Sequence, residues 1–132
     1  MRMLNVHLAT VVLCASVAAC GSRPLQITAI QLGRSLNPDR SVAKFTTIFA
    51  PSDTVYLSVL TTNGGSGTIS VRWTYGEKVI GESTKRVANR DFAATDFPLR
   101  SAGGFPPGQY SVEVFLDGQA VATKTFKVES GS

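Results

Sequence analysis

The side chains best suited to nucleophilic, acid–base or metal chemistry all lie near the start of this 132-residue sequence. Its one histidine is His7, and its two cysteines are Cys14 and Cys20. A histidine base beside a thiolate would suit acyl transfer, and imidazole together with thiolates would suit zinc. Whether this chemistry is available depends on the fate of the segment that carries these residues.

That segment has the composition of a signal peptide. Arg2 gives it a positive start, and residues 8–19 (LATVVLCASVAA) form an apolar run that ends in small residues. The run is shorter than the roughly 20 residues that a membrane-spanning helix needs. We therefore predict that residues 1–19 are removed, and that His7 and Cys14 leave with them. The mature chain would then lack the groups for histidine-based catalysis, for a histidine–thiolate zinc site and for an internal disulfide.

The residues around the predicted cleavage point are Val17-Ala18-Ala19-Cys20. They resemble the lipobox of bacterial lipoproteins, in which an aliphatic residue and two small residues precede the cysteine that becomes the new N-terminus. The resemblance implies a diacylglyceryl group on the Cys20 sulfur and a further acyl chain on its amine. Gly21 stands where an aspartate would signal inner-membrane retention. In a Gram-negative source the resemblance therefore implies the outer membrane, facing the periplasm.

An ordinary secretory signal, with Cys20 as an unmodified thiol, is the alternative. The four-residue match, its position and the preceding apolar run together favour lipidation. Residues 20–24 would then be a short acylated tether, and residues 25–129 a single domain.

Hydrophobic alternation predicts that this domain is all-β. Residues 68–75 and 109–116 alternate most clearly, and Asp117-Gly118 after the second of these suits a tight hairpin turn. The other predicted strands cover residues 25–32, 42–49, 54–62, 92–99 and 120–128, with a further short strand that begins at Val79-Ile80 and gives way to a polar stretch up to Val87. Seven or eight short strands separated by turn signals are typical of a two-sheet antiparallel sandwich.

Trp73 on a central predicted strand, the run Pro106-Pro107-Gly108-Gln109-Tyr110 and the closing Phe126-Lys127-Val128 resemble immunoglobulin-like and fibronectin-type sandwiches. The resemblance implies a core tryptophan on the third strand and a tyrosine, Tyr110, that closes a corner by bonding to the backbone. The cysteine pair of antibody domains is absent. The fold by itself implies no activity.

Carboxylates are the remaining candidates for catalysis. Asp91 and Asp96 are five residues apart on an extended segment, so we expect them to point to opposite faces. No run of spaced aspartates resembles a calcium loop. We therefore expect no enzyme, no cofactor and no metal site.

Basic and aromatic side chains are candidates for binding. The two basic groupings are Arg34, Arg40 and Lys44, and Lys85, Arg86 and Arg90. They would contact phosphorylated lipid, an anionic glycan or an acidic protein patch, unless they are solvated loop charges. An exposed patch of Phe105 and Phe115 is the candidate protein contact, and core packing is the alternative for either ring. With 13 Lys and Arg against 9 Asp and Glu, the chain is too weakly basic to indicate nucleic-acid binding.

These observations predict a lipid-anchored, non-catalytic protein of the bacterial cell envelope. We expect it to contact a partner protein or a cell-wall component. A small lipoprotein that inhibits a periplasmic hydrolase is the alternative.

Overall fold

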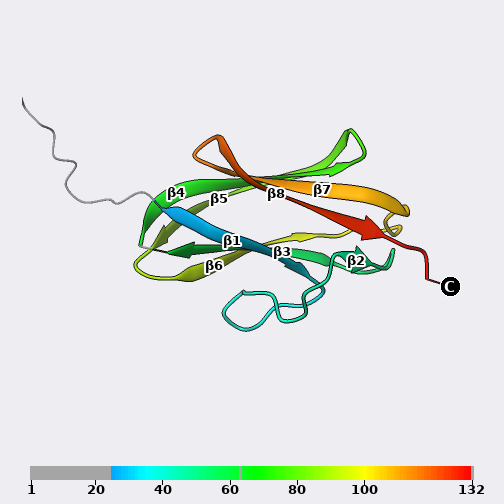
Figure 1. Cartoon of the computed structure of the whole chain (residues 1–132), viewed down its shortest axis with the longest axis horizontal. Helices are drawn as coiled ribbons and strands as arrows, with labels where there is room; N and C mark the ends of the chain where they lie inside the picture. The colour runs from blue at the N-terminus through cyan, green and yellow to red at the C-terminus, as the bar shows by residue number, and fades with distance from the viewer. Residues whose placement is uncertain (1–24, 63, 132) are drawn as a thin grey trace, which may run out of the picture.

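The computed structural model describes residues 25–62 and 64–131. These residues form eight β-strands in two sheets, which confirms the prediction of an all-β, two-sheet domain (Figure 1). One sheet has the strand order β1-β3-β6 and the other has the order β2-β8-β7-β4-β5. The strands are β1 (Gln26–Gly33), β2 (Ile48–Phe49), β3 (Val55–Thr62), β4 (Gly65–Tyr75), β5 (Lys78–Asn89), β6 (Ala93–Leu99), β7 (Gly108–Leu116) and β8 (Gln119–Val128). The described residues include no helix that is long and apolar enough to cross a membrane.

The core between the sheets is built from the alternating positions of the strands. Trp73 on β4 and Val112 on β7 face each other in an antiparallel pair, and both are buried, whereas Arg72 is exposed. The ring of Phe126 on β8 packs edge-on against Trp73, with 6.0 Å between centroids. From the three-stranded sheet the core takes Ile30, Leu32, Val55, Leu57, Val59 and Phe97. Alternation therefore assigns the buried face of the central strands correctly.

The predicted hairpin between β7 and β8 is confirmed. Asp117 and Gly118 both have positive φ, at 50° and 84°, as a tight turn between antiparallel strands requires. The Asp117 carboxylate also accepts a hydrogen bond of 2.9 Å from the backbone N–H of Thr68. The turn is thus fastened to the start of β4.

The predicted strand over residues 42–49 is wrong for most of its length, because only Ile48–Phe49 is a strand. Residues 34–47 instead form a loop that covers the outer face of the three-stranded sheet (Figure 1). Val42 is a buried residue of this loop, and its N–H donates to the side-chain oxygen of Gln31 on β1 at 3.2 Å. Of the β-branched and aromatic side chains in this segment, Val42 and Phe49 are buried, whereas Phe45 and Ile48 are exposed. Phe45 is linked to the end of β1 by a single bridge to Gly33.

The expectation of a purely antiparallel sandwich is also wrong at one edge. β2 pairs with β8 in parallel, with Ile48 opposite Lys127. The loop carries the chain from the three-stranded sheet to the edge of the other sheet, and the short crossing strand runs in the same direction as β8. The backbone N–H of Lys127 donates to the carbonyl of Thr47 at 2.8 Å, which secures this edge.

The sandwich has two distinct ends (Figure 1). The near end holds the start of β1 and the turn between β5 and β6, because Gln26 pairs with Thr62 and Thr61 pairs with Ala93. The far end holds the turn between β4 and β5, the end of β6 and residues 100–107. β7 runs between the two ends, and its 9 residues span about 30 Å.

Candidate functional site

At the far end, the segment before β7 is held by two tyrosine hydroxyls. The Tyr110 hydroxyl donates to the carbonyl of Pro106 at 2.5 Å, and the Tyr75 hydroxyl donates to the carbonyl of Pro107 at 2.9 Å. A Cβ on Gly108 would lie 2.9 Å from Cε1 of Tyr75, so glycine is needed for this close approach. The Tyr110 bond is the backbone contact expected of the corner tyrosine.

The same segment is fixed from its core side. Phe105 packs edge-on against Tyr110, with 5.9 Å between ring centroids, and its N–H donates to the carbonyl of Pro51 at 2.8 Å. Burial raises the pKa of Tyr110, and its neighbour Tyr75 raises that pKa further. The Tyr110 hydroxyl therefore stays protonated at neutral pH and remains a donor to Pro106.

Beside this segment lies a cleft of about 360 Å³ between the ends of the two sheets. Apolar atoms make up most of its lining, which comes from Tyr75, Lys78, Ile80, Leu99, Arg100, Ser101, Phe105, Pro106 and Tyr110. Strands β4 and β5 supply one wall, and the end of β6 with residues 100–106 supplies the other. The volume lies at the lower end of the roughly 300–1,000 Å³ found for ligand pockets, so it fits one or two apolar side chains of a partner.

Two cations stand at the rim of this cleft. Lys78 and Arg100 are both exposed, and neither forms an ion pair with another described residue. An apolar floor with free positive charges beside it suits a ligand that carries an apolar group next to an anionic one. The sequence analysis did not single out these two residues. In the sequence, the available signal was the apolar pair Val79-Ile80 just after the turn. In the structure both of these side chains are exposed.

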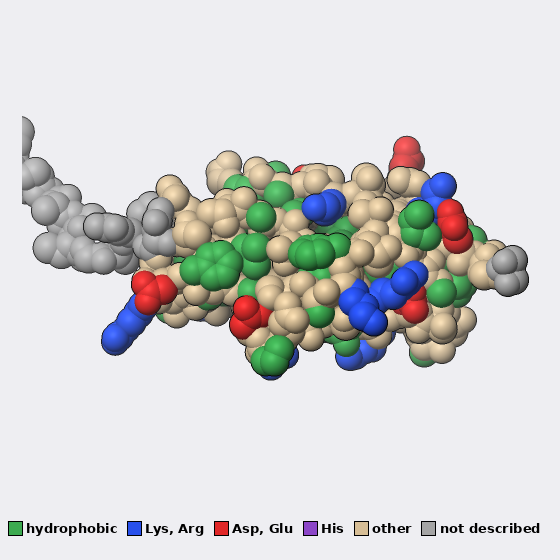
Figure 2. All heavy atoms as spheres, turned by 60° about the horizontal axis from the view of Figure 1, so that its bottom comes forward, with side chains coloured by type: hydrophobic (Ala, Val, Ile, Leu, Met, Phe, Trp, Pro, Cys, Tyr) green, Lys and Arg blue, Asp and Glu red, His purple; other side chains and the backbone are tan. Residues whose placement is uncertain are grey.

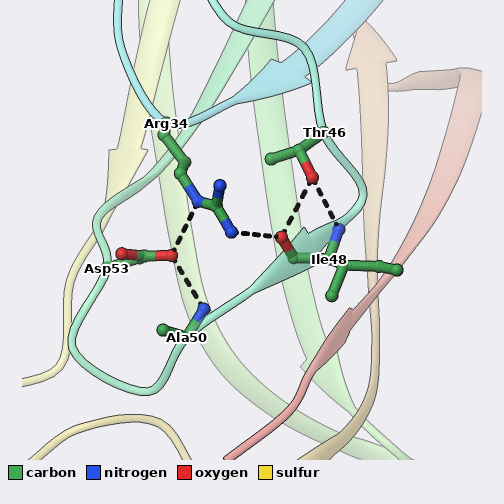
Figure 3. Close-up of polar contacts among 5 residues, drawn as sticks. All are labelled: Arg34, Thr46, Ile48, Ala50 and Asp53. Carbon is green, nitrogen blue, oxygen red and sulfur yellow. Dashed lines mark hydrogen bonds and ion pairs between the residues drawn. The ribbon is translucent and has the colours of Figure 1, made fainter. Parts of the chain in front are cut away.

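Arg34, from the first basic grouping, is engaged within the fold (Figure 3). Its Nε lies 3.0 Å from the Asp53 carboxylate, and its Nη2 donates to the carbonyl of Ile48 at 3.0 Å. The same carboxylate oxygen accepts the N–H of Ala50 at 2.7 Å, and the Thr46 hydroxyl donates to the Ile48 carbonyl at 2.9 Å. Arg34 thus joins the end of β1 to β2.

The two basic groupings approach each other at Asp96 on β6. Nη1 of Arg40 lies 3.8 Å from the Asp96 carboxylate, and Nζ of Lys85 donates to the backbone carbonyl of Asp96 at 2.5 Å. Nζ of Lys85 also lies 5.0 Å from the centroid of the Phe97 ring. The remaining candidates, Lys44, Arg86 and Arg90, are exposed and form no ion pair with another described residue. Figure 2 shows positive side chains beside acidic ones on the loop-covered side, and not as one continuous basic surface.

Phe105 and Phe115 do not form the predicted exposed patch. Phe105 is 5% exposed because its ring packs on Tyr110 in the core, and it also lines the far-end cleft. Phe115 is half-buried on β7, with the guanidinium of Arg72 5.1 Å from its ring centroid. It lines a shallow depression together with Ser70 and other residues of the five-stranded sheet. The two rings therefore belong to different surroundings.

The predicted lipidation site at Cys20 lies outside the described residues, as do the signal peptide at 1–19 and the tether at 20–24. Within the described residues, no group of three or more histidine, cysteine, aspartate or glutamate side chains could hold a metal ion.

No family model matches the chain, and no curated protein matches it. Solved structures resemble it in fold. The alkylpurine DNA glycosylase AlkC of Pseudomonas fluorescens aligns with a TM-score of 0.53 and 11% identity, over 80% of this chain and 30% of that one. The β-glucosidase EmGH1 of Erythrobacter marinus aligns with a TM-score of 0.53 and 12% identity, over 80% of this chain and 15% of that one. The chain therefore corresponds to less than a third of either protein, and the likeness concerns the fold alone.

Proposed function

We propose that this chain is a lipid-anchored, non-catalytic protein of the bacterial cell envelope that binds a partner protein or cell-wall component through the far-end cleft. In a Gram-negative source its site would be the outer membrane, facing the periplasm. The observation that carries the proposal is the position of the cleft relative to the predicted anchor.

Cys20 is five residues before Leu25, the first residue of the described domain. A chain of that length spans at most about 18 Å, so lipid on Cys20 would hold the near end of the sandwich close to the membrane. The far-end cleft lies about 30 Å further along β7. An anchored domain would therefore present its apolar cleft, with Lys78 and Arg100 at the rim, toward the envelope space.

We further propose that the domain is immunoglobulin-like. The buried Trp73 on β4 and the bond from the Tyr110 hydroxyl to the carbonyl of Pro106 support this, since both features are typical of that fold. Sandwiches of this kind commonly bind through loops gathered at one end, as the far-end cleft would require.

A photo-crosslinking amino acid in place of Pro106 tests the binding proposal, because Pro106 is exposed and lines the cleft. The variant would be expressed in the source bacterium and irradiated in intact cells. We expect one discrete crosslinked species. The same species should weaken when Ile80→Asp, which puts a negative charge into the apolar wall, is added to the variant.

The matched control carries the crosslinker in place of Val121, which is 46% exposed on β8 and does not line the cleft. Equal crosslinking from both positions, or a Pro106 adduct unaffected by Ile80→Asp, would contradict binding through the cleft.

A further inference from the structure

We propose that the near end of the sandwich docks on the lipid surface to which Cys20 is anchored, with Phe92 as the contact that enters the membrane interface. This inference rests on the lipid anchor of the proposed function. It adds a second, non-covalent contact with the same membrane, which fixes how the domain stands on it.

The length of the tether selects the near end. Whatever their conformation, residues 20–24 cannot place Cys20 more than about 18 Å from Leu25. Leu25 directly precedes β1, and Gln26 at the start of β1 pairs with Thr62 on β3. The acyl chains must therefore enter the bilayer close to this end of the sandwich.

The turn between β5 and β6 lies at that same end. Thr61 on β3 pairs with Ala93 at the start of β6, so β1 and β6 flank β3 on either side. Since neighbouring strands are about 4.8 Å apart, Ala93 lies about 10 Å across the sheet from the start of β1. Phe92 immediately precedes Ala93. In Figure 1 the start of β1 and this turn both lie at the left-hand end of the sandwich.

The chemistry of this turn fits a lipid surface. Phe92 is 57% exposed, although a ring of this size is normally buried. Arg90 is exposed and forms no ion pair with another described residue. Aromatic rings favour the membrane interface, and arginine is attracted to anionic headgroups. The exposed carboxylate of Asp91 offsets part of this charge, so the ring is the main contact.

The turn is also fixed in place, as a docking contact requires. The backbone of Arg90 packs against the turn between β3 and β4. A Cβ on Gly64 would lie only 2.2 Å from the Arg90 carbonyl oxygen, and the φ of Gly64 is +50°. The turn between β3 and β4 therefore supports the segment that carries Phe92.

Brominated lipids, which quench tryptophan fluorescence on contact, test this orientation. The full-length lipidated protein would be extracted from membranes and reconstituted into vesicles of phosphatidylethanolamine and phosphatidylglycerol, with or without bromine on the acyl chains. We expect Phe92→Trp to show blue-shifted emission that the brominated lipids quench. Phe45→Trp is the matched control, because Phe45 is 66% exposed and bridges to Gly33 at the opposite end of β1. The buried Trp73 is a background common to both variants.

Quenching confined to Phe92→Trp supports docking, and its reduction by Arg90→Gln or by removal of phosphatidylglycerol supports the charge contribution. Equal quenching of both variants, or none, would overturn docking while leaving the anchor intact, provided the protein stays on the vesicles. If the emission of Phe92→Trp shifted to the blue only after envelope extract was added to the vesicles, the turn would be assigned to a protein partner, and lipid docking would again be overturned. An unmodified Cys20 in the mass spectrum of the same sample would overturn the proposed anchor itself.

Discussion

The hydroxyl of Tyr110 should stabilise the far end of the sandwich at neutral pH and lose this effect in alkali. In Tyr110→Phe the bond of 2.5 Å to the Pro106 carbonyl is lost and the ring is kept. A hydrogen bond of this kind contributes about 1 kcal/mol net to folding, and the exposed Pro106 leaves its carbonyl free to bond water. We therefore expect the free energy of unfolding to fall by about 1 kcal/mol, or roughly five-fold in the unfolding equilibrium constant.

The pH dependence follows from the raised pKa of Tyr110. Burial keeps its hydroxyl protonated in the folded state above pH values of about 10, at which a tyrosine of the unfolded chain ionises. Between these two pKa values the unfolded state binds fewer protons than the folded state, so the stability of the native protein falls as pH rises. The variant lacks this titration. The difference in the free energy of unfolding between the native domain and Tyr110→Phe should thus be complete below about pH 10 and shrink above it.

Urea denaturation of the soluble domain, residues 25–132, at neutral pH and above pH 10 measures both effects. With an m-value of about 1–1.5 kcal/mol/M, the neutral midpoint should fall by roughly 0.7–1 M. Tyr75→Phe is the matched control, since it removes a hydroxyl bonded to the next carbonyl, that of Pro107. A Tyr110→Phe midpoint equal to that of the native domain at neutral pH, or a deficit that grows in alkali, would refute this reasoning.

Three further changes test other parts of the structure. Gly33→Ala would put a Cβ 2.1 Å from the carbonyl oxygen of Lys44 and displace the 34–47 loop. We expect the free energy of unfolding in urea to fall by about 2 kcal/mol, because the backbone hydrogen bonds from Arg34 to Lys44 and from Thr46 to Leu32 would be lost; an unchanged midpoint would argue against this contact. Arg34→Gln should accelerate hydrogen exchange at the amide of Lys127, which donates to the carbonyl of Thr47 just before β2, while the global free energy of unfolding falls by less than about 1 kcal/mol. An equal change in exchange rate at all amides would refute a local role for Arg34. Ile80→Asp should weaken partner capture with a change in stability within about 0.5 kcal/mol, because Ile80 is 36% exposed; unfolding of the variant would show that it belongs to the core.

Most of the strand pattern could be predicted from the sequence because alternation is a local signal. Strands β4 and β7 alternate apolar inward and polar outward positions, and the Asp-Gly turn fixes the register of the hairpin that follows. The segment 42–49 could not be predicted in the same way. Its β-branched residues have the composition of a strand, but Val42 lies in a loop and is buried where that loop packs against β1, which is a tertiary contact that the local pattern does not contain.

The candidate site was predictable only in part, for the same reason. The run from Pro106 to Tyr110 identified the corner, and the hydroxyl bond of Tyr110 is where that pattern predicts it. The cleft beside it depends on the turn after β4 meeting the end of β6, which brings Lys78 and Arg100 to one rim from positions far apart in the sequence. For Phe105 the sequence left exposure and core packing open, and the structure has core packing, because the ring lies edge-on against Tyr110.

The mass of the N-terminal peptide of the mature protein, purified from the membranes of the source bacterium, tests the central claim most directly. The account predicts a peptide that begins at Cys20 and carries a thioether-linked diacylglyceryl group, with a further acyl chain on the amine, and processing that globomycin blocks. A peptide that begins elsewhere, or one that begins at Cys20 with an unmodified thiol, would contradict it.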